Sequence, residues 1–223
     1  MIVASAPWNT SFAISIIPQL LEAFVEVTLL VTVLGSVIAA ILGLAFAVVR
    51  RARVPVLAPL VTAFVEFVRS TPIPVQLVFV FYVLPEHGPR LTAIVTGVIV
   101  LGIHYACYYA EVYRAGIEGV PVGQWEACTA LSLSPLHKWR LVVLPQAFRN
   151  VLPALGNYVI SMWKEVPFLV LIAAPTMVQV ASKIGGDRFR YVEPFTIAAL
   201  LFLAVSYPSA LAMRKLEKYL GHA

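Results

Sequence analysis

Charge is scarce in this sequence. Lys, Arg, Asp and Glu make up 12% of the 223 residues, about half the fraction found in a typical soluble domain. The broad apolar set reaches 61%, and the mean hydropathy is +0.89. This composition excludes a soluble globular domain and a disordered chain, and it indicates an integral membrane protein.

Motifs for metal, nucleotide or catalytic chemistry are also missing. The two cysteines, Cys107 and Cys128, lie among apolar residues without C-x-x-C or Cys/His spacing, so we predict that they pack in the interior. There is no G-x-x-x-x-G-K-[ST] phosphate loop, which an ATP-binding chain of that type requires. No Ser/His/Asp or paired-carboxylate set has a spacing suited to catalysis. We therefore predict no metal, no cofactor and no enzymatic activity for this chain.

Long apolar segments fill most of the sequence. A helix needs roughly 20 apolar residues to cross a bilayer, and solid apolar runs favour helices over the alternating strands of a barrel. Two of the segments are interrupted by charges and prolines. We predict an all-α integral membrane protein, a single transmembrane domain over residues 1–223. Its five spans are expected at Leu21–Val49, Val54–Leu84, Leu91–Tyr113, Val151–Ile172 and Pro194–Met213.

The basic residues predict the orientation. Ten lie on one side of the five-span arrangement: Arg50, Arg51, Arg53, Arg114, Lys138, Arg140, Arg149, Arg214, Lys215 and Lys218. Four lie on the other: Arg90, Lys183, Arg188 and Arg190. Because Lys and Arg concentrate on the cytoplasmic side, the amino terminus is expected outside and the carboxyl terminus inside. The net charge of +5 then reflects membrane anchoring and predicts no nucleic-acid partner.

Small residues repeat along the first span. Gly35, Ala39, Gly43 and Ala47 follow one another at a spacing of four. A stripe of this kind lets two membrane helices approach closely, so we predict a packing face here.

The stretch 114–150 is predicted to be a cytoplasmic loop containing a short helix. Pro121 can open a helix, and Gln124–Leu131 reads as a helical run that is too short to span a bilayer. It is rich in apolar residues but lacks the dense basic face of a lipid-binding helix. We therefore expect it to dock onto another protein.

This loop resembles a known family. Glu126-Ala127-Cys128 is followed after three residues by Ser132. Nine residues then lead to Val142, and one more residue separates Val142 from Leu144-Pro145. The pattern is similar to E-A-A-x3-G-x9-I-x-L-P of permease subunits of bacterial ABC importers, with small replacements at Cys128, Ser132 and Val142. The resemblance implies a coupling helix at Gly123–Leu133, seated on the ATPase. Its expected contact residues are Gly123, Trp125, Glu126, Ala127, Ala130, Leu131 and Ser132.

Other motifs are similar to the polar amino-acid uptake subgroup of these permeases. Phe67–Leu77 resembles that subgroup's R-G-T-P-x-x-x-Q motif, and Ala110–Ile117 and Leu144–Ala147 also match it. The strings Tyr113–Ala127 and Tyr191–Pro194 look most like permeases for ectoine and hydroxyectoine.

The resemblance implies a type I importer in a bacterial inner membrane. Such a transporter combines two permease subunits, two cytoplasmic ABC ATPase subunits and a periplasmic substrate-binding protein. The second permease subunit is either the same chain or a sister chain.

Charges lie deep inside two predicted spans. Arg69 and the pair Lys164-Glu165 are each about fifteen residues from the cytoplasmic end of their span, roughly 22 Å at 1.5 Å per residue. Such charges cost on the order of 2.5–3.5 kcal/mol each, so they should face a partner or a wet cavity. Pro72 and Pro167 also break their helices and free backbone carbonyls at this depth.

Two broken helices with charges of both signs predict a site for a zwitterion. Alternatively, Glu66 and Arg69 form a structural pair three residues apart on one helix. The candidate substrate-binding residues are Glu165, Lys164, Arg69, Glu66, Gln76 and Met162.

Two functions of other classes remain open from the sequence. An intramembrane enzyme would use Lys164, Glu165 and His104, although His104 on its own is more readily explained as a hydrogen-bonded packing residue. A membrane scaffold would only recruit a cytoplasmic partner through Gly123–Leu133. The leading hypothesis is a permease that moves a small polar zwitterion into the cytoplasm.

Overall fold

The computed structural model describes residues 7–86 and 88–220, and no strand occurs among them. Four helical stretches are long and apolar enough to cross a membrane, and a bent pair of helices makes a fifth. The predicted all-α membrane fold is confirmed.

The regular α-helices are α1 (Thr10–Ala23), α2 (Leu30–Arg51), α3 (Leu57–Ser70), α4 (Ile73–Val78), α5 (Ala93–Glu118), α6 (Val122–Ala130), α7 (Pro135–His137), α8 (Leu144–Glu165), α9 (Met177–Arg188) and α10 (Val192–Tyr219). Wider π-helical turns occur at η1 (Phe24–Leu29), η2 (Phe79–Val83) and η4 (Lys138–Val143), and tighter 3₁₀ turns at η3 (Leu84–Glu86) and η5 (Val166–Ile172).

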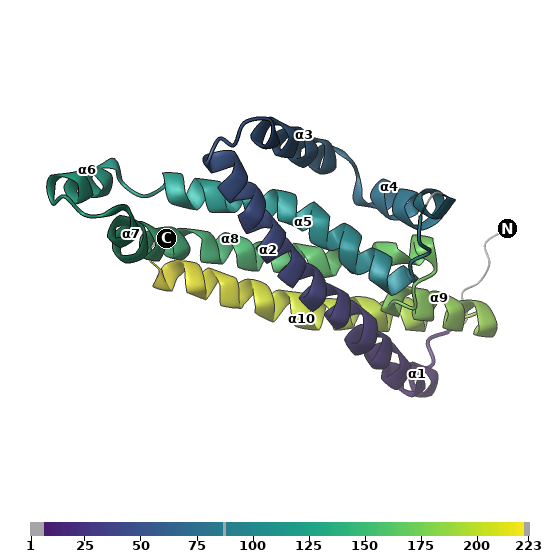
Figure 1. The fold of residues 1–223 in the computed structure, drawn as a ribbon. Coiled ribbons are helices and arrows are strands. Elements are labelled where there is room, and N and C mark those ends of the chain that lie inside the picture. Colours follow the sequence, from purple (N-terminus) through teal and green to yellow (C-terminus); the bar gives the residue numbers. More distant parts are fainter. Residues whose placement is uncertain (1–6, 87, 221–223) are drawn as a thin grey trace.

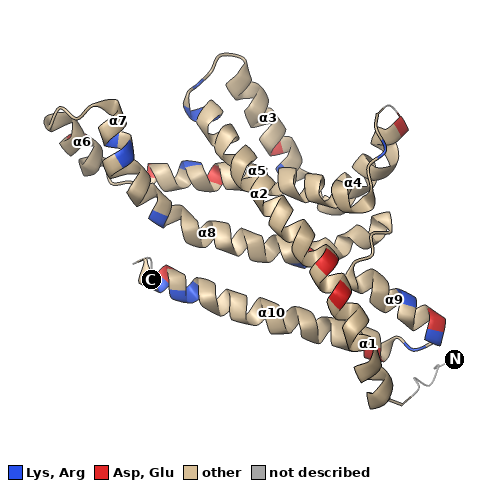
Figure 2. Ribbon diagram, turned by 60° about the horizontal axis from the view of Figure 1, so that its bottom comes forward, with Lys and Arg blue, Asp and Glu red and all other residues tan. Residues whose placement is uncertain are grey.

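Helices α5, α8 and α10 run roughly along one direction, and α2 crosses them diagonally (Figure 1). Helices α6 and α7 lie at one end together with the last turns of α10, and α1 and α9 lie at the opposite end. Lys and Arg mark the ends of α2 and α10 and the α7 region (Figure 2). The basic side inferred from the sequence is thus one physical end of the bundle.

The first span is longer than expected. It runs without a break from Thr10 to Arg51, 42 residues, and not from Leu21. Asn9 caps its start by accepting a hydrogen bond from the Phe12 amide at 3.0 Å, and Pro18 is accommodated inside α1. At 1.5 Å per residue this helix is about 60 Å long, roughly twice the apolar thickness of a bilayer, so part of it must lie outside the hydrocarbon.

Helix α5 is the most buried of the spans, and α2 packs closely against it. All four residues of the small stripe (Gly35, Ala39, Gly43 and Ala47) are buried, which confirms the predicted packing face. A Cβ atom at Gly43 would come within 2.6 Å of the Tyr109 Cβ and 2.8 Å of the Ala106 carbonyl oxygen. Glycine is therefore required for the close approach of the two helices.

The fourth span begins earlier than the sequence suggested. It extends from Pro135 to Ile172, whereas the prediction began it at Val151. Residues 138–150, which mix basic and apolar side chains, continue the same helix. Its carboxyl-terminal end narrows to the 3₁₀ turn η5, which contains Pro167, and is followed by Ala173 with a left-handed φ of 55°. The predicted break at Pro167 is confirmed.

The sequence Gly185-Gly186-Asp187 between the last two apolar segments predicts a loop. This prediction is wrong, because these residues belong to α9. Gly185 serves packing and not a turn, since a Cβ there would lie 2.4 Å from the Tyr191 ring. The turn comes later, at Phe189, where φ is 53°.

Candidate functional site

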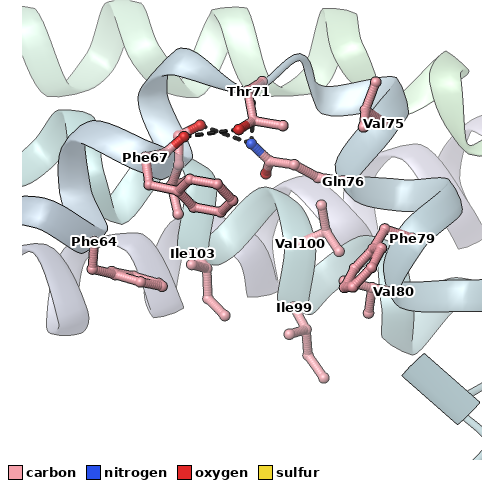
Figure 3. A pocket seen from close by; sticks show the side chains of 11 residues that line it. Phe64, Phe67, Thr71, Val75, Gln76, Phe79, Val80, Ile99, Val100 and Ile103 are labelled. Atoms are coloured by element: carbon pink, nitrogen blue, oxygen red, sulfur yellow. Dashed lines mark hydrogen bonds between the residues drawn. The ribbon is translucent and has the colours of Figure 1, made fainter. Parts of the chain in front are cut away.

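The bend in the second span separates α3 from α4 by 107°. Pro72 lies at the break and removes a backbone donor. The Gln76 side chain takes its place, because its amide nitrogen donates to the Val68 and Thr71 carbonyls, both at 2.8 Å. Figure 3 shows this amide reaching back to the end of α3. Gln76, predicted to bind substrate, is occupied with closing the broken helix.

His104 stabilises the same bend from α5. Its Nδ1 lies 3.1 Å from the Gln76 amide nitrogen, and its side chain is buried. The prediction that His104 is a hydrogen-bonded packing residue is confirmed, and Gln76 is its only hydrogen-bond partner in the described part of the chain.

A hollow of about 330 Å³ lies beside this bend, between α3, α4 and α5. Its walls are mostly apolar, with Phe64, Phe67 and Phe79 around the labelled Gln76 (Figure 3). No charged side chain lines it. It is therefore suited to an apolar chain and not to a zwitterion.

Arg69 contacts groups on two helices. Its guanidinium lies 3.4 Å from Glu66 and 4.0 Å from Glu111, and it sits 5.1 Å from the centre of the Tyr108 ring. The predicted Glu66–Arg69 pair is thus present. It is not exclusive, since the Arg69 guanidinium also faces α5.

Glu165 is at the end of α8 and is half-buried. Its Oε2 accepts a hydrogen bond of 2.6 Å from the Tyr105 hydroxyl on α5. No ion pair to Glu165 occurs within residues 7–86 and 88–220. This carboxylate is therefore fixed in place by a neutral donor and keeps accepting capacity for a cation.

A group of tyrosines lies between Arg69 and Glu165. The Tyr108 and Tyr158 ring centres are 5.4 Å apart, and Tyr105 lies 6.0 Å from Tyr158. Arg69 stands over Tyr108 at one end, and Glu165 bonds Tyr105 at the other. We call this arrangement the tyrosine strip: Arg69, Tyr108, Tyr158, Tyr105 and Glu165. Along the strip, a cation is followed in space by aromatic faces and then by an anion.

Two predicted site residues lie away from the tyrosine strip. Lys164 is exposed and lines a separate hollow with Phe195 and Ser206 of α10, as expected for a neighbour about 100° around the helix from Glu165. Met162 is fully buried, and its sulfur lies 3.6 Å from the Ser36 hydroxyl of α2. Met162 therefore packs helix against helix.

Glu111, for which the sequence predicts no role, lies at the centre of a charge network. It accepts from Arg50 of α2 at 2.5 Å and from Arg114 at 2.8 Å, and Arg114 also bonds Glu118 at 2.6 Å. With Arg69 at 4.0 Å, one carboxylate faces three arginines. Its place in the motif Ala110–Ile117 was the available signal, but only the fold brings Arg50 and Arg69 to it.

The tyrosines were also missed. Tyr105, Tyr108 and Tyr109 recur at helical spacing on α5, which could have marked an aromatic face. Tyr158 joins them from α8, far away in the sequence.

Helix α6 spans Val122–Ala130, close to the predicted coupling helix Gly123–Leu133. Gly123, Glu126, Ala127, Ala130 and Leu131 are all exposed, while Cys128 is buried. Ser132 has a φ of 52°, the left-handed conformation that glycine adopts most readily at a helix end. Ser132 thus stands in a left-handed conformation at the position where the family motif has glycine.

The family described as "Binding-protein-dependent transport system inner membrane component" matches residues 35–221. A probable amino-acid ABC transporter permease protein, y4tG of Sinorhizobium fredii, is 40% identical over 212 residues, covering 93% of this chain and 91% of the relative. The probable glutamine ABC transporter permease GlnP of Bacillus subtilis is 33% identical, covering 86% and 89%.

A solved structure also matches. A chain of an amino acid ABC transporter, crystallised "with histidines", has a TM-score of 0.90 at 29% identity and covers 96% of this chain and 100% of its own. A chain of the inward-facing MetNI methionine ABC transporter has a TM-score of 0.72 at 19% identity, covering 96% and 99%, which supports the fold alone.

The chain belongs to the family of binding-protein-dependent transport system inner membrane components. It is a multi-pass membrane permease subunit of the ABC importer type and not an enzyme. The hypotheses of an intramembrane enzyme and of a simple scaffold are not favoured.

Proposed function

We propose that this permease carries a small zwitterion, an amino acid or a similar solute, along the tyrosine strip into the cytoplasm. The main observation that supports this proposal is that the Arg69 guanidinium and the Glu165 carboxylate lie at opposite ends of the strip. Arg69 would receive the carboxylate of the substrate, and Glu165 its cationic group. Aromatic faces between them favour a cation as well.

The finer substrate is proposed from two sources. Relatives named for glutamine, arginine and L-cystine transport support an amino acid. The strings Tyr113–Ala127 and Tyr191–Pro194 support ectoine or hydroxyectoine as the alternative zwitterion. Thermal-shift screening of the cognate binding protein against both groups of compounds distinguishes these alternatives.

Glu165→Gln tests the site. It keeps the size and the acceptor for Tyr105 but removes the charge, so a charge-assisted contact of roughly 1.5–3 kcal/mol is lost. We expect transport at subsaturating substrate to fall by about tenfold or more, with assembly and basal ATP hydrolysis close to normal. The measurement is uptake into proteoliposomes that contain the whole importer.

Glu86→Gln is the matched control, because it makes the same chemical change at an exposed position of the 3₁₀ turn η3 and should leave uptake unchanged. Normal uptake by Glu165→Gln would remove Glu165 from the site.

We propose further partners for the assembled importer. Helix α6 contacts a cytoplasmic ABC ATPase subunit, a second permease subunit completes the membrane part, and a periplasmic substrate-binding protein delivers the solute. In the membrane the amino-terminal end faces outside and the end of α10 faces the cytoplasm.

Ala127→Asp tests the ATPase contact. Ala127 is exposed on α6, so the variant should fold, but an unpaired carboxylate buried in the contact would cost several kcal/mol. Recovery of the ATPase with the tagged permease should fall sharply, whereas Ala127→Ser should retain it. Equal recovery for both variants would contradict the assignment of α6.

A further inference from the structure

The last turn of α2 carries two neighbouring arginines with different partners. Arg50 bonds Glu111 of α5 at 2.5 Å. Arg51 turns instead toward the cytoplasmic segment, where its guanidinium carbon lies 5.0 Å from the Trp139 ring centre and 5.7 Å from that of Trp125. One end of α2 is thus connected both to the membrane core and to the cytoplasmic helices.

The two tryptophan rings that Arg51 contacts are held in place by packing and by a hydrogen bond. Their rings meet edge to face at 5.7 Å, and the Trp125 indole N–H donates to the Val120 carbonyl at 3.3 Å. Both rings pack on a small apolar cluster that contains Val120, Val143 and Ala147. Lys138 lies 5.8 Å from the Trp125 ring as a second cation. Tryptophan is the strongest cation-binding ring among the side chains, and a planar guanidinium can stack on it.

Helix α2 extends from this contact to the segment that holds Glu165. A Cβ at Gly35 would lie 3.0 Å from the Met162 sulfur, and Ser36 also touches this sulfur. Met162 precedes Glu165 by one helical turn. A rigid helix that is held at Arg51 and pressed against Met162 can pass a displacement from one end to the other.

We infer that Arg51, stacked on Trp125 and Trp139, is the positioning residue that transmits movement of α6 through α2 to the α8 segment around Glu165. This inference rests on the proposed contact between α6 and the ATPase. It assigns the transmission to a side chain that contacts neither the ATP site nor the tyrosine strip.

The experiment measures movement in the assembled importer. Ser161, exposed on α8 four residues before Glu165, is replaced by Cys in a chain whose native Cys107 and Cys128 are changed to Ala. The rate of maleimide labelling is then compared between the nucleotide-free complex and the complex trapped with ATP and vanadate. With Arg51 present, we expect the labelling rates of the two states to differ at least threefold. In Arg51→Gln, the difference between the two states should be less than half of that in the parent.

Arg53→Gln is the matched control, because it removes the same charge two residues later. Arg53 makes no ion pair or cation–π contact within the described ranges, so the labelling response of Arg53→Gln should equal that of the parent. Trp139→Leu should lower the response as Arg51→Gln does, and the double variant should lower it no further, because both remove one contact.

Recovery of the ATPase distinguishes failure of the proposed α6–ATPase contact from failure of the inference about Arg51. It should be equal in the parent, Arg51→Gln and Arg53→Gln. Loss of recovery in the parent itself contradicts the proposed function. Full recovery with equal labelling responses in Arg51→Gln and the parent overturns the inference about Arg51, as does the absence of any nucleotide response in the parent.

Discussion

Glu111→Gln should destabilise the permease more than the loss of any peripheral charge pair. The substitution leaves Arg50, Arg69 and Arg114 facing a neutral amide, and Arg50 is only 18% exposed at its side chain. Leaving a partly buried cation without its anion costs about 2 kcal/mol or more after allowance for the remaining solvent. Thermal unfolding in detergent, followed by size-exclusion chromatography, measures the effect.

Glu118→Gln is the comparison for this prediction. It breaks one pair with Arg114 whose side chains are 45% and 55% exposed, so it should cost about 0.5 kcal/mol or less. Equal stability of the two variants would show that the network around Glu111 contributes no more than a surface pair.

Gly43→Ala should have a similarly large effect through packing. Its new Cβ would lie 2.8 Å from the Ala106 carbonyl oxygen, which belongs to the backbone of α5 and cannot rotate away. The two central helices must separate, and we expect a loss of about 2–3 kcal/mol with a lower yield of folded chain. The measurement is again thermal unfolding of the purified permease.

Gly123→Ala provides the control for the methyl group itself. A Cβ at Gly123 meets nothing within 4 Å, so this variant should be as stable as the parent or slightly more so, because alanine favours a helix. If Gly43→Ala behaved like Gly123→Ala, α2 and α5 would not need their close approach.

The parts of the fold that could be predicted depend on local patterns. Apolar runs give the spans, and the small residues of α2 give its buried face, because both depend only on spacing within one segment. Pro72 and Pro167 mark the helix breaks for the same reason. Gly185 was misread because a glycine required by a neighbouring tyrosine looks the same in sequence as a glycine required by a turn.

The candidate site was predicted only in part. Arg69 and Glu165 stand out in the sequence because a charge inside an apolar span is conspicuous wherever it lies. The aromatic faces between them come from α5 and α8, and no spacing along the chain links Tyr108 to Tyr158. The sequence could not show that Gln76 bonds the carbonyls of Val68 and Thr71, because only the bend between α3 and α4 brings these groups together.

The bend between α3 and α4 has a consequence for how the chain enters the membrane. Helix α3 has 14 residues, fewer than the roughly 20 that span a bilayer, and the carbonyls at its end would be costly in lipid without a donor. Gln76 supplies that donor from the following helix. We therefore expect the two half-helices to enter the bilayer together, with the bend already closed, as one unit over residues 57–86.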